Sequence, residues 1–162
     1  MKKLLLILLC VPLIGFGQTA NEYFDKAYDY AENGEYQLAI DNYTRAIRID
    51  PDYADAYNNR GVAYRKLGNY EDAIADYTRA IRIDPDYADA YYNRGLAYYY
   101  LGNYEDAIAD FTRAIRIDPD DASAYKNRGI TKENAGLSYC SDYKKACDLG
   151  KEECCEWYDQ CK

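Results

Sequence analysis

The sequence predicts an all-α protein, a solenoid of antiparallel helix pairs, and three observations support this fold class. Residues 55–88 and 89–122 form an internal repeat, because the two 34-residue segments differ at only six positions. Periods of this length are typical of arrays in which one supersecondary unit stacks on the next. Glycine and proline recur along the chain with the same period. Four of the six differences follow the spacing i, i+4, i+7 and i+8, which places them on one face of a helix.

Residues 1–17 are expected to form a signal peptide and not part of the fold. Two lysines precede an apolar run, Leu4 to Phe16, and small residues follow around Gly17. This order is typical of a secretory signal, and the run is too short for a comfortable membrane span. Cleavage near Gly17 predicts an exported protein, either periplasmic or extracellular.

Composition narrows the class of partner and of chemistry. The whole chain has a net charge of −8, and removal of residues 1–17, which hold two lysines and no acid, changes it to −10. An acidic chain of this kind disfavours nucleic acid and anionic lipid membranes as partners. The chain contains no histidine, so the commonest general base and metal ligand is missing. We therefore expect no enzyme activity, no cofactor and no metal site.

Each unit is expected to consist of helix, turn, helix and turn. A first glycine series ends the first helix in the left-handed conformation, and a proline series ends the second helix. A second glycine series lies inside the first helix, where close approach of a partner helix, at Ala73 and Ala80, is expected to compensate for the poor helix propensity of glycine. The series are Gly34, Gly68, Gly102 and Gly136; Pro51, Pro85 and Pro119; and Gly61, Gly95 and Gly129.

The periodic glycine and proline positions divide the chain after residue 17 into repeat units. We expect helix pairs at 20–53, 54–87 and 88–121, followed by a modified fourth pair at 122–150. The second helix of the fourth pair starts two residues early, after its glycine. Acids and arginines that alternate on the second helices, such as Asp76 with Arg79, are expected to form surface ion pairs.

The periodic residues resemble the pattern of the tetratricopeptide repeat, a 34-residue helix pair with aromatic, small and proline residues at fixed positions. One copy of this pattern is met by Tyr57, Gly61, Tyr64, Ala73, Tyr77, Ala80 and Pro85. Arg60 and Arg94 depart from it, because leucine is usual there. The resemblance covers about residues 20–148 and implies a right-handed superhelix. It also implies a concave groove, lined by the first helix of each repeat, that holds a peptide or a partner helix.

The four clustered differences lie on the face that the resemblance assigns to this groove. Asn58, Val62, Arg65 and Lys66 in one copy become Tyr92, Leu96, Tyr99 and Tyr100 in the next. Rigid aromatic side chains are common anchors of binding energy, and an asparagine in each repeat is expected to hydrogen-bond an extended backbone. The predicted groove residues are Phe24, Tyr28, Asn58, Asn59, Val62, Arg65, Lys66, Tyr92, Asn93, Leu96, Tyr99, Tyr100 and Asn127.

Two alternatives to this groove remain open. In the first, Tyr99 and Tyr100 serve only for packing: their rings lie against the charged groups of Arg65 and Lys66 in cation–π contacts, or against the aliphatic parts of those side chains. The family also has a clamp for acidic C-terminal tails, and this chain lacks it. Asn59 and Asn93 match the asparagine of that clamp, but Phe24, Tyr28, Asp89 and Asn93 stand where its other polar members would be. We therefore do not expect binding to chaperone tails.

The C-terminal segment 151–162 is expected to form a cysteine-rich capping helix. Four cysteines are spaced by sevens, and a glycine at position 150 indicates a break between two helices that fold back on each other. Facing residues of such a hairpin have a constant index sum, so the predicted disulfides are Cys140–Cys161 and Cys147–Cys154, with Cys155 as the alternative to Cys154. Zinc is the rival interpretation, disfavoured by the export signal and by the lack of a Cys-x-x-Cys pair.

Together these features favour a non-enzymatic scaffold that binds a protein or peptide in the concave groove. The alternative is a structural subunit of a cell-envelope or secretion assembly, which would use the convex or end surfaces. A thiol oxidoreductase would need a reactive cysteine, and Cys155 is the only unusual candidate.

Overall fold

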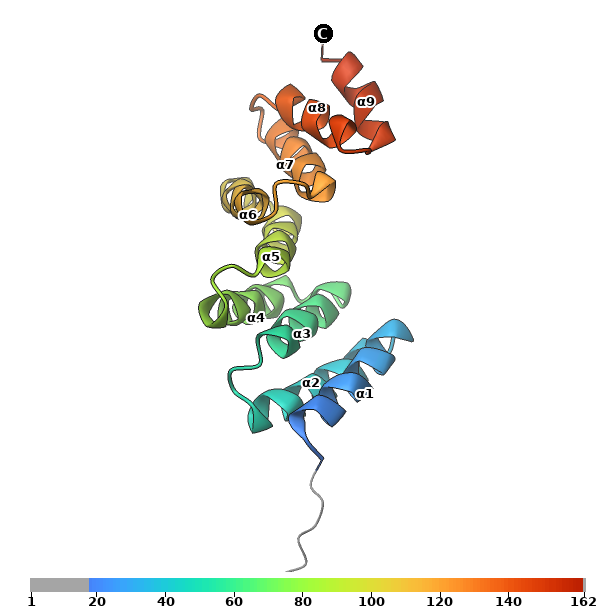
Figure 1. Cartoon of the computed structure of the whole chain (residues 1–162), viewed down its shortest axis with the longest axis vertical. Coiled ribbons are helices and arrows are strands. Elements are labelled where there is room, and N and C mark those ends of the chain that lie inside the picture. Colours follow the sequence, from blue (N-terminus) through green and yellow to red (C-terminus); the bar gives the residue numbers. More distant parts are fainter. Residues whose placement is uncertain (1–17, 162) are drawn as a thin grey trace, which may run out of the picture.

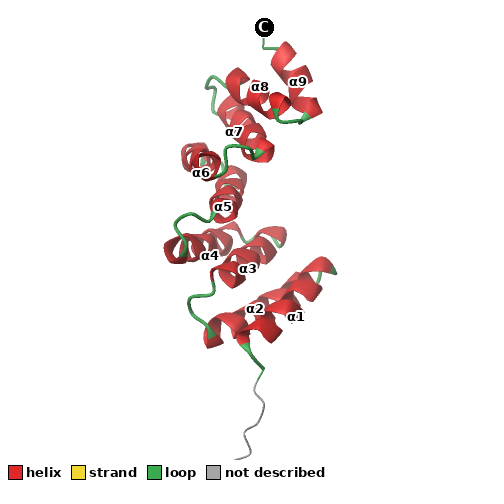
Figure 2. Ribbon diagram, viewed as in Figure 1, coloured by secondary structure: helices red, strands yellow, loops and turns green. Residues whose placement is uncertain are grey.

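The computed structural model describes residues 18–161, and within them the chain consists of helices joined by short turns, with no strand (Figure 2). The predicted signal peptide, residues 1–17, lies outside the described residues. The helices are α1 (Ala20–Glu32), α2 (Tyr36–Ile49), α3 (Ala54–Lys66), α4 (Tyr70–Ile83), α5 (Ala88–Tyr100), α6 (Tyr104–Ile117), α7 (Ala122–Asn134), α8 (Cys140–Asp148) and α9 (Glu152–Asp159). The predicted all-α class is confirmed.

The helices pair in antiparallel fashion and stack into an elongated solenoid, with α1 at one end and α9 at the other (Figure 1). Each helix packs on the next, and the first helices of successive pairs, α1, α3, α5 and α7, also touch one another. They therefore form one continuous face. None of the helices within residues 18–161 has both the length and the apolar character needed to cross a membrane.

The turns follow the predicted glycine register. Gly34, Gly68, Gly102 and Gly136 all have positive φ angles, between +69° and +83°. This is the left-handed region, which glycine enters without a Cβ penalty. Gly150, with φ of +95°, ends α8 in the same region.

The glycines inside the first helices allow close helix packing, but their contact differs from the prediction. A Cβ built on Gly95 would lie 2.9 Å from Phe111 Cε1, and one on Gly61 would lie 2.7 Å from Tyr77 Cε1. An aromatic ring of the second helix therefore covers each glycine, where the sequence had predicted alanines. Tyr77 and Phe111 are fully buried as a result.

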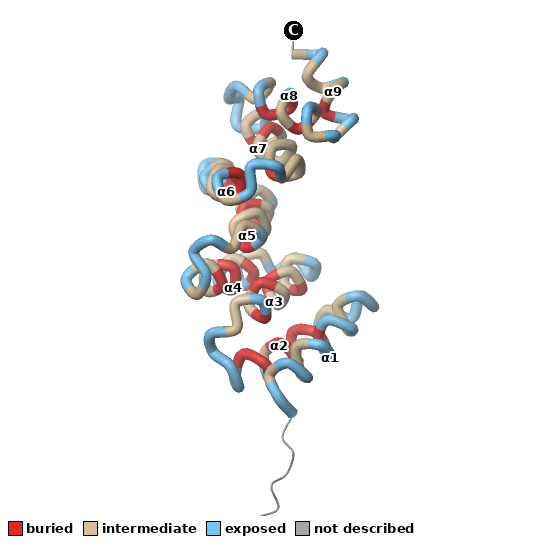
Figure 3. The backbone as a smooth tube through the Cα atoms, viewed as in Figure 1, coloured by how far each residue is buried: buried red, intermediate tan, exposed pale blue. Residues whose placement is uncertain are grey.

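The core runs along the axis of the solenoid, and the turns are exposed (Figure 3). In each first helix of the later pairs, the third residue after the N-cap is a fully buried alanine: Ala56, Ala90 and Ala124. In α9 the residue at this position is Cys154, which is also fully buried. The capping helix therefore packs as the first helix of a fifth unit.

A buried ion pair occurs in each of the second to fourth units. Arg60 donates from Nε and Nη2 to the two carboxylate oxygens of Asp76, both at 2.7 Å, and from Nη1 to Thr44 Oγ1 at 2.9 Å. The same arrangement joins Arg94 to Asp110 and Thr78, and Arg128 to Asp142 and Thr112. Because the threonine belongs to the preceding unit, each arginine fixes one unit on the next.

The predicted surface pairing of Asp76 with Arg79 is therefore wrong. Asp76 is only 6% exposed and faces Arg60 on the neighbouring helix, whereas Arg79 reaches Asp52 of the preceding turn at 3.4 Å. Burial raises the pKa of Asp76, against the hydrogen bonds and charge of Arg60. The three-residue spacing of Asp76 and Arg79 along α4 had suggested a pair, but the packing of α3 on α4 brings Arg60 to Asp76 instead.

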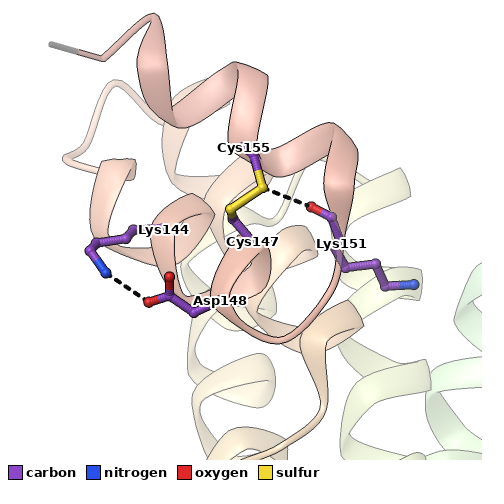
Figure 4. Close-up of a disulfide and its surroundings, with 5 residues drawn as sticks. All are labelled: Lys144, Cys147, Asp148, Lys151 and Cys155. Atoms are coloured by element: carbon purple, nitrogen blue, oxygen red, sulfur yellow. Dashed lines mark hydrogen bonds and ion pairs between the residues drawn. A yellow bond between two sulfur atoms is a disulfide. The ribbon is translucent and has the colours of Figure 1, made fainter.

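Two disulfides fasten the C-terminal end. The predicted bridge Cys140–Cys161 is present, with 5.9 Å between the Cα atoms. The second bridge joins Cys147 to Cys155, the alternative partner (Figure 4), so the predicted pair Cys147–Cys154 is wrong. Cys154 is turned into the core against Tyr143 and Ala146. The next residue in α9, Cys155, is the one that faces Cys147.

Candidate binding groove

Three hollows open along the continuous face of the first helices. The first hollow, of about 290 Å³, lies between α1, α2 and α3, and its lining includes Tyr28, Glu32, Tyr43, Asn59, Val62 and Lys66. The second hollow, of about 220 Å³, lies between α5, α6 and α7, with Leu96, Tyr99, Tyr100, Phe111, Asn127 and Ile130 in its lining. The third hollow, of about 300 Å³, lies at the C-terminal end and is lined by Ile130, Glu133, Tyr139, Tyr143, Trp157 and Gln160.

The three hollows occupy equivalent places in the array. Tyr43, Phe111 and Tyr143 stand at the same position of their second helices and line the first, second and third hollow in turn. In each case a first helix supplies one wall and the first helix of the next unit supplies the other. For the third hollow this second wall is α9 with its C-cap, which contribute Trp157 and Gln160. The groove therefore extends to the cap.

Several predicted groove residues lie together in these hollows. Tyr28, Asn59, Val62 and Lys66 line the first hollow, and Leu96, Tyr99, Tyr100 and Asn127 line the second. Tyr28 and Tyr100 are among the most exposed large hydrophobic residues of the described chain, at 50% and 55%. These residues are therefore positioned to contact a ligand.

Three other predicted groove residues lie in packing contacts. Phe24 stacks on Tyr53, with 5.0 Å between ring centroids and 20° between planes. Asn58 is buried, and Tyr92 packs against the ring of Phe111 at 5.8 Å. All three occupy the same position of the repeat, one turn before the hollows.

The asparagines of the first helices bond to the preceding repeat. Asn93 Nδ2 donates to Asn58 Oδ1 at 3.2 Å, and Asn127 Nδ2 donates to Tyr92 Oη at 2.8 Å. These bonds hold adjacent first helices together. Each amide has two N–H groups and an oxygen with two lone pairs, so bonding of an extended ligand backbone by the same residues stays a prediction.

At the middle joint, between α3 and α5, the positions equivalent to the hollows hold side chains in mutual contact. Tyr100 stacks on Tyr70, with 5.3 Å between centroids and 15° between planes, and Tyr99 meets Tyr100 edge to face at 5.6 Å. Among the described residues no cation–π contact joins these tyrosines to Arg65 or Lys66.

Arg65 and Lys66 form a basic centre on this face. No ion pair of the described residues includes either of them. Arg65 Nε and Tyr77 Oη are both buried, and neither makes a hydrogen bond of good geometry. Burial raises the pKa of Tyr77 to about 12, and the charge of Arg65 acts against this rise. Arg65 and Lys66 therefore make the α3 side of this joint locally basic, with Glu32 on the opposite wall of the first hollow, although the chain as a whole is acidic.

The third hollow is the part of the groove that the sequence interpretation missed. Glu133, Tyr139, Tyr143, Trp157 and Gln160 were not among the predicted residues. Trp157 corresponds to the repeating asparagine, but it follows Asn127 by 30 residues and not 34. The separation is shorter because α8 has nine residues where α2, α4 and α6 have fourteen, and this hides the equivalence from a search at a fixed period.

Family models locate the repeats directly. A model described as "TPR repeat" matches residues 27–68 and 63–102, and one described as "Tetratricopeptide repeat" matches residues 88–121. Together they span more than half of the chain. The chain is a tetratricopeptide-repeat protein. No curated protein matches it in sequence.

Solved structures support this assignment. The crystal structure of MamA resembles this tetratricopeptide-repeat protein with a TM-score of 0.78 at 29% identity, covering 83% of this chain and 80% of MamA. The first repeat domain of Spaghetti (RPAP3), bound to the HSP90 peptide SRMEEVD, gives 0.72 at 28% identity, covering 74% and 94%. The Arabidopsis OM64 domain gives 0.69 at 28% identity, covering 70% and 94%.

Proposed function

We propose that this protein is a non-enzymatic scaffold that binds an extended peptide segment of a partner protein along the face of its first helices. The observation that carries the proposal is the series of equivalent hollows on that face, which side chains of successive units line. Concave sites with apolar walls and a few polar groups are the usual form of ligand sites. A structural neighbour, the Spaghetti domain, is itself bound to a peptide.

The test replaces two groove residues of the third unit by the residues at the same positions of the second unit. In the variant Tyr99→Arg/Tyr100→Lys, the third unit carries the residues found in the second. The loss of the Tyr100–Tyr70 stack is expected to cost about 1 kcal/mol of stability. Affinity for a partner is expected to fall by about 2 kcal/mol or more, the scale of a binding hot spot.

Partners are captured from an extract of the native organism with the wild-type protein and with the swap variant, and are quantified by mass spectrometry. Arg116→Ala, an exposed change on the second helix α6, serves as the control and is expected to retain the partners. Partners that both variants hold as firmly as the wild type would contradict groove binding and favour an assembly subunit that uses other surfaces.

We also propose that the protein works outside the cytoplasm, in the periplasm or in the extracellular space. The N-terminal segment has the composition of a secretory signal, and the four cysteines Cys140, Cys147, Cys155 and Cys161 are paired in disulfides, which persist in oxidising compartments. Cell fractionation and N-terminal sequencing of the native protein test this. A cytoplasmic protein that retains residues 1–17 would contradict it.

A further inference from the structure

The second and third hollows are adjacent on this face, and we refer to the two together as the trough. Ile130 lines both: it is a far-wall residue of the second hollow and a near-wall residue of the third. Around it lie the rings of Tyr99 and Tyr100 on one side and those of Tyr139 and Trp157 on the other. These five large apolar or aromatic side chains lie close together on one face. Clusters of this kind commonly provide most of the binding energy for a partner protein.

The outer wall of this trough depends on the capping helix. α9 has only eight residues, and an isolated helix of this length is not stable in water. The bridge Cys147–Cys155 fastens its first half to α8, and Cys140–Cys161 fastens the turn that follows its end. The disulfides therefore hold Trp157 in place above Tyr143, with 5.2 Å between ring centroids.

Charge distinguishes the two ends of the trough. Its N-terminal end adjoins the basic centre, Arg65 and Lys66, which makes no ion pair within the described chain. Its C-terminal end holds the carboxylate of Glu133, which accepts a hydrogen bond from Tyr143 Oη at 2.6 Å. A complementary ligand carries an anionic group at the first end and none at the second.

Spacing along the ligand follows from the helix packing. Neighbouring first helices touch, as α5 and α7 do, and packed helices are roughly 8–10 Å apart. An extended chain advances about 3.3–3.6 Å per residue, so one step between adjacent hollows corresponds to about three residues.

From these observations we propose that the trough binds an extended acidic-aromatic segment of a partner protein. The segment places two large apolar side chains, about three residues apart, in the second and third hollows. It places an acidic residue, about three residues from the nearer anchor, on Arg65 and Lys66. This inference rests on the proposed function, since it names the chemistry of the partner that the groove takes.

The test is a selection from a random peptide library displayed on phage, with the oxidised mature protein as bait. The expected result is enrichment of sequences that combine an acidic residue with two large apolar residues in this spacing, in one chain direction or the other. A selection that yields no enriched sequences, or only sequences without the acid and the two anchors, overturns the proposal.

The best enriched peptide is then synthesised, and its affinity is measured by fluorescence polarisation. Trp157→Ala and Gln160→Arg are each expected to weaken binding about tenfold or more. Gln160 is exposed at the edge of the hollow, so its variant tests the site even where loss of Trp157 disturbs the cap. Arg65→Ala/Lys66→Ala is expected to weaken binding and to reduce its dependence on salt.

Arg116→Ala, an exposed change on α6 outside the groove, is the matched control and is expected to change the affinity less than about threefold. Tyr28→Ala, in the first hollow, is measured beside it. Binding that depends on Tyr28 but not on Trp157 or Gln160 would leave the groove function standing and overturn the C-terminal trough. Binding that no groove variant affects would overturn both. Reduction of the two disulfides is expected to weaken binding as much as Trp157→Ala does, and unchanged affinity after reduction would contradict the role of α9.

A second copy of the chain is the other occupant that the test identifies. Light scattering on the eluted peak of a sizing column gives the mass in solution. A dimer that Gln160→Arg converts to a monomer would show that the trough binds another copy, and it would overturn the proposal of a partner segment.

Discussion

At the residue scale, the buried arginines are the clearest departure from the family pattern. Leucine is usual at the position of Arg94, and a guanidinium is tolerated there because Asp110 and Thr78 accept its N–H groups. The three side chains come from two repeats, so the arginine does more than fill space. It specifies how one repeat sits on the next.

We expect Asp110→Ala to lower the free energy of unfolding by about 3–5 kcal/mol, because it leaves the charge of Arg94 buried without its partner. The double variant Arg94→Leu/Asp110→Ala is expected to lose much less, since both charges are gone. Urea denaturation followed by circular dichroism measures the three proteins. Arg113→Ala, whose partner Asp86 is exposed, is the control, with an expected loss below about 1 kcal/mol. Equal losses of stability for Asp110→Ala and Arg113→Ala would contradict a buried ion pair between Arg94 and Asp110.

Cys154 provides a second prediction at this scale. Its thiol is fully buried and unbridged, and burial raises its pKa. We expect a thiol reagent to leave Cys154 unmodified in the native mature protein and to modify it after unfolding in urea without reductant. Cys154→Ala is expected to change the melting temperature little, because alanine stands at the equivalent position, Ala124, of α7. Peptide mapping that finds Cys155 modified in place of Cys154 would contradict the assigned bridge.

At the scale of helices, the glycines inside the first helices set how closely each pair packs. In an exposed helix, alanine is more favourable than glycine by about 1 kcal/mol. At position 95 this gain is outweighed, because a Cβ there would lie 2.9 Å from Phe111 Cε1.

We therefore expect Gly95→Ala to destabilise the protein by about 1–3 kcal/mol, the usual cost of an overpacked contact. Ala109→Gly, at an exposed position of α6, is the control for propensity alone and is expected to cost about 1 kcal/mol. Thermal unfolding followed by circular dichroism compares them. A Gly95→Ala protein more stable than the wild type would show that the helices can separate without cost.

The helices also show which features a sequence can predict. Their order and ends follow from local chemistry, such as the positive φ of Gly68 or the break at Gly150, and these were predictable. The pairing of Arg60 with Asp76 was not, because the two residues are 16 positions apart and a nearer arginine offered a plausible partner. Whether Cys154 or Cys155 pairs with Cys147 depends on the rotation of α9 about its own axis against the core. The rule that facing residues of a hairpin have a constant index sum does not include this rotation.

The candidate groove was predictable only in part, for a related reason. Tyr28, Leu96 and Tyr100 could be identified because substitutions between two near-identical repeats mark one helix face. Phe24 and Tyr92 share that pattern but pack against neighbouring rings, since one turn of helix separates the hollow from the core. The third hollow was hidden because its walls depart from the period.

At the scale of the whole molecule, buried tyrosines make stability sensitive to alkaline pH. Burial raises the pKa of Tyr77 to about 12, and burial also raises the pKa of Tyr43 and Tyr143. These folded-state values exceed the unfolded value of about 10, so the stabilisation is complete below about pH 10 and is lost as the pH rises through the folded values.

We expect the melting temperature to fall steeply between about pH 10 and pH 11.5. Tyr77→Phe, which copies Phe111 of the next repeat, is expected to have nearly the stability of the wild type at pH 8, because Tyr77 Oη makes no hydrogen bond of good geometry and only interacts with the neighbouring Arg65. Above pH 10 it is expected to lose less stability than the wild type, by up to about 1.4 kcal/mol for each pH unit. If the melting temperatures of the two proteins fall in parallel as the pH rises, Tyr77 does not contribute to the loss of stability at alkaline pH.

The stacked pair Tyr70 and Tyr100 has a consequence for the groove as a whole. In a perfectly periodic array, a ligand with the same period would bind equally well in several registers and would slide between them. Side chains that meet at the middle joint, flanked by open hollows on both sides, remove that degeneracy. A bound segment then has one lowest-energy alignment, so a repetitive scaffold can hold its partner at a single, defined position.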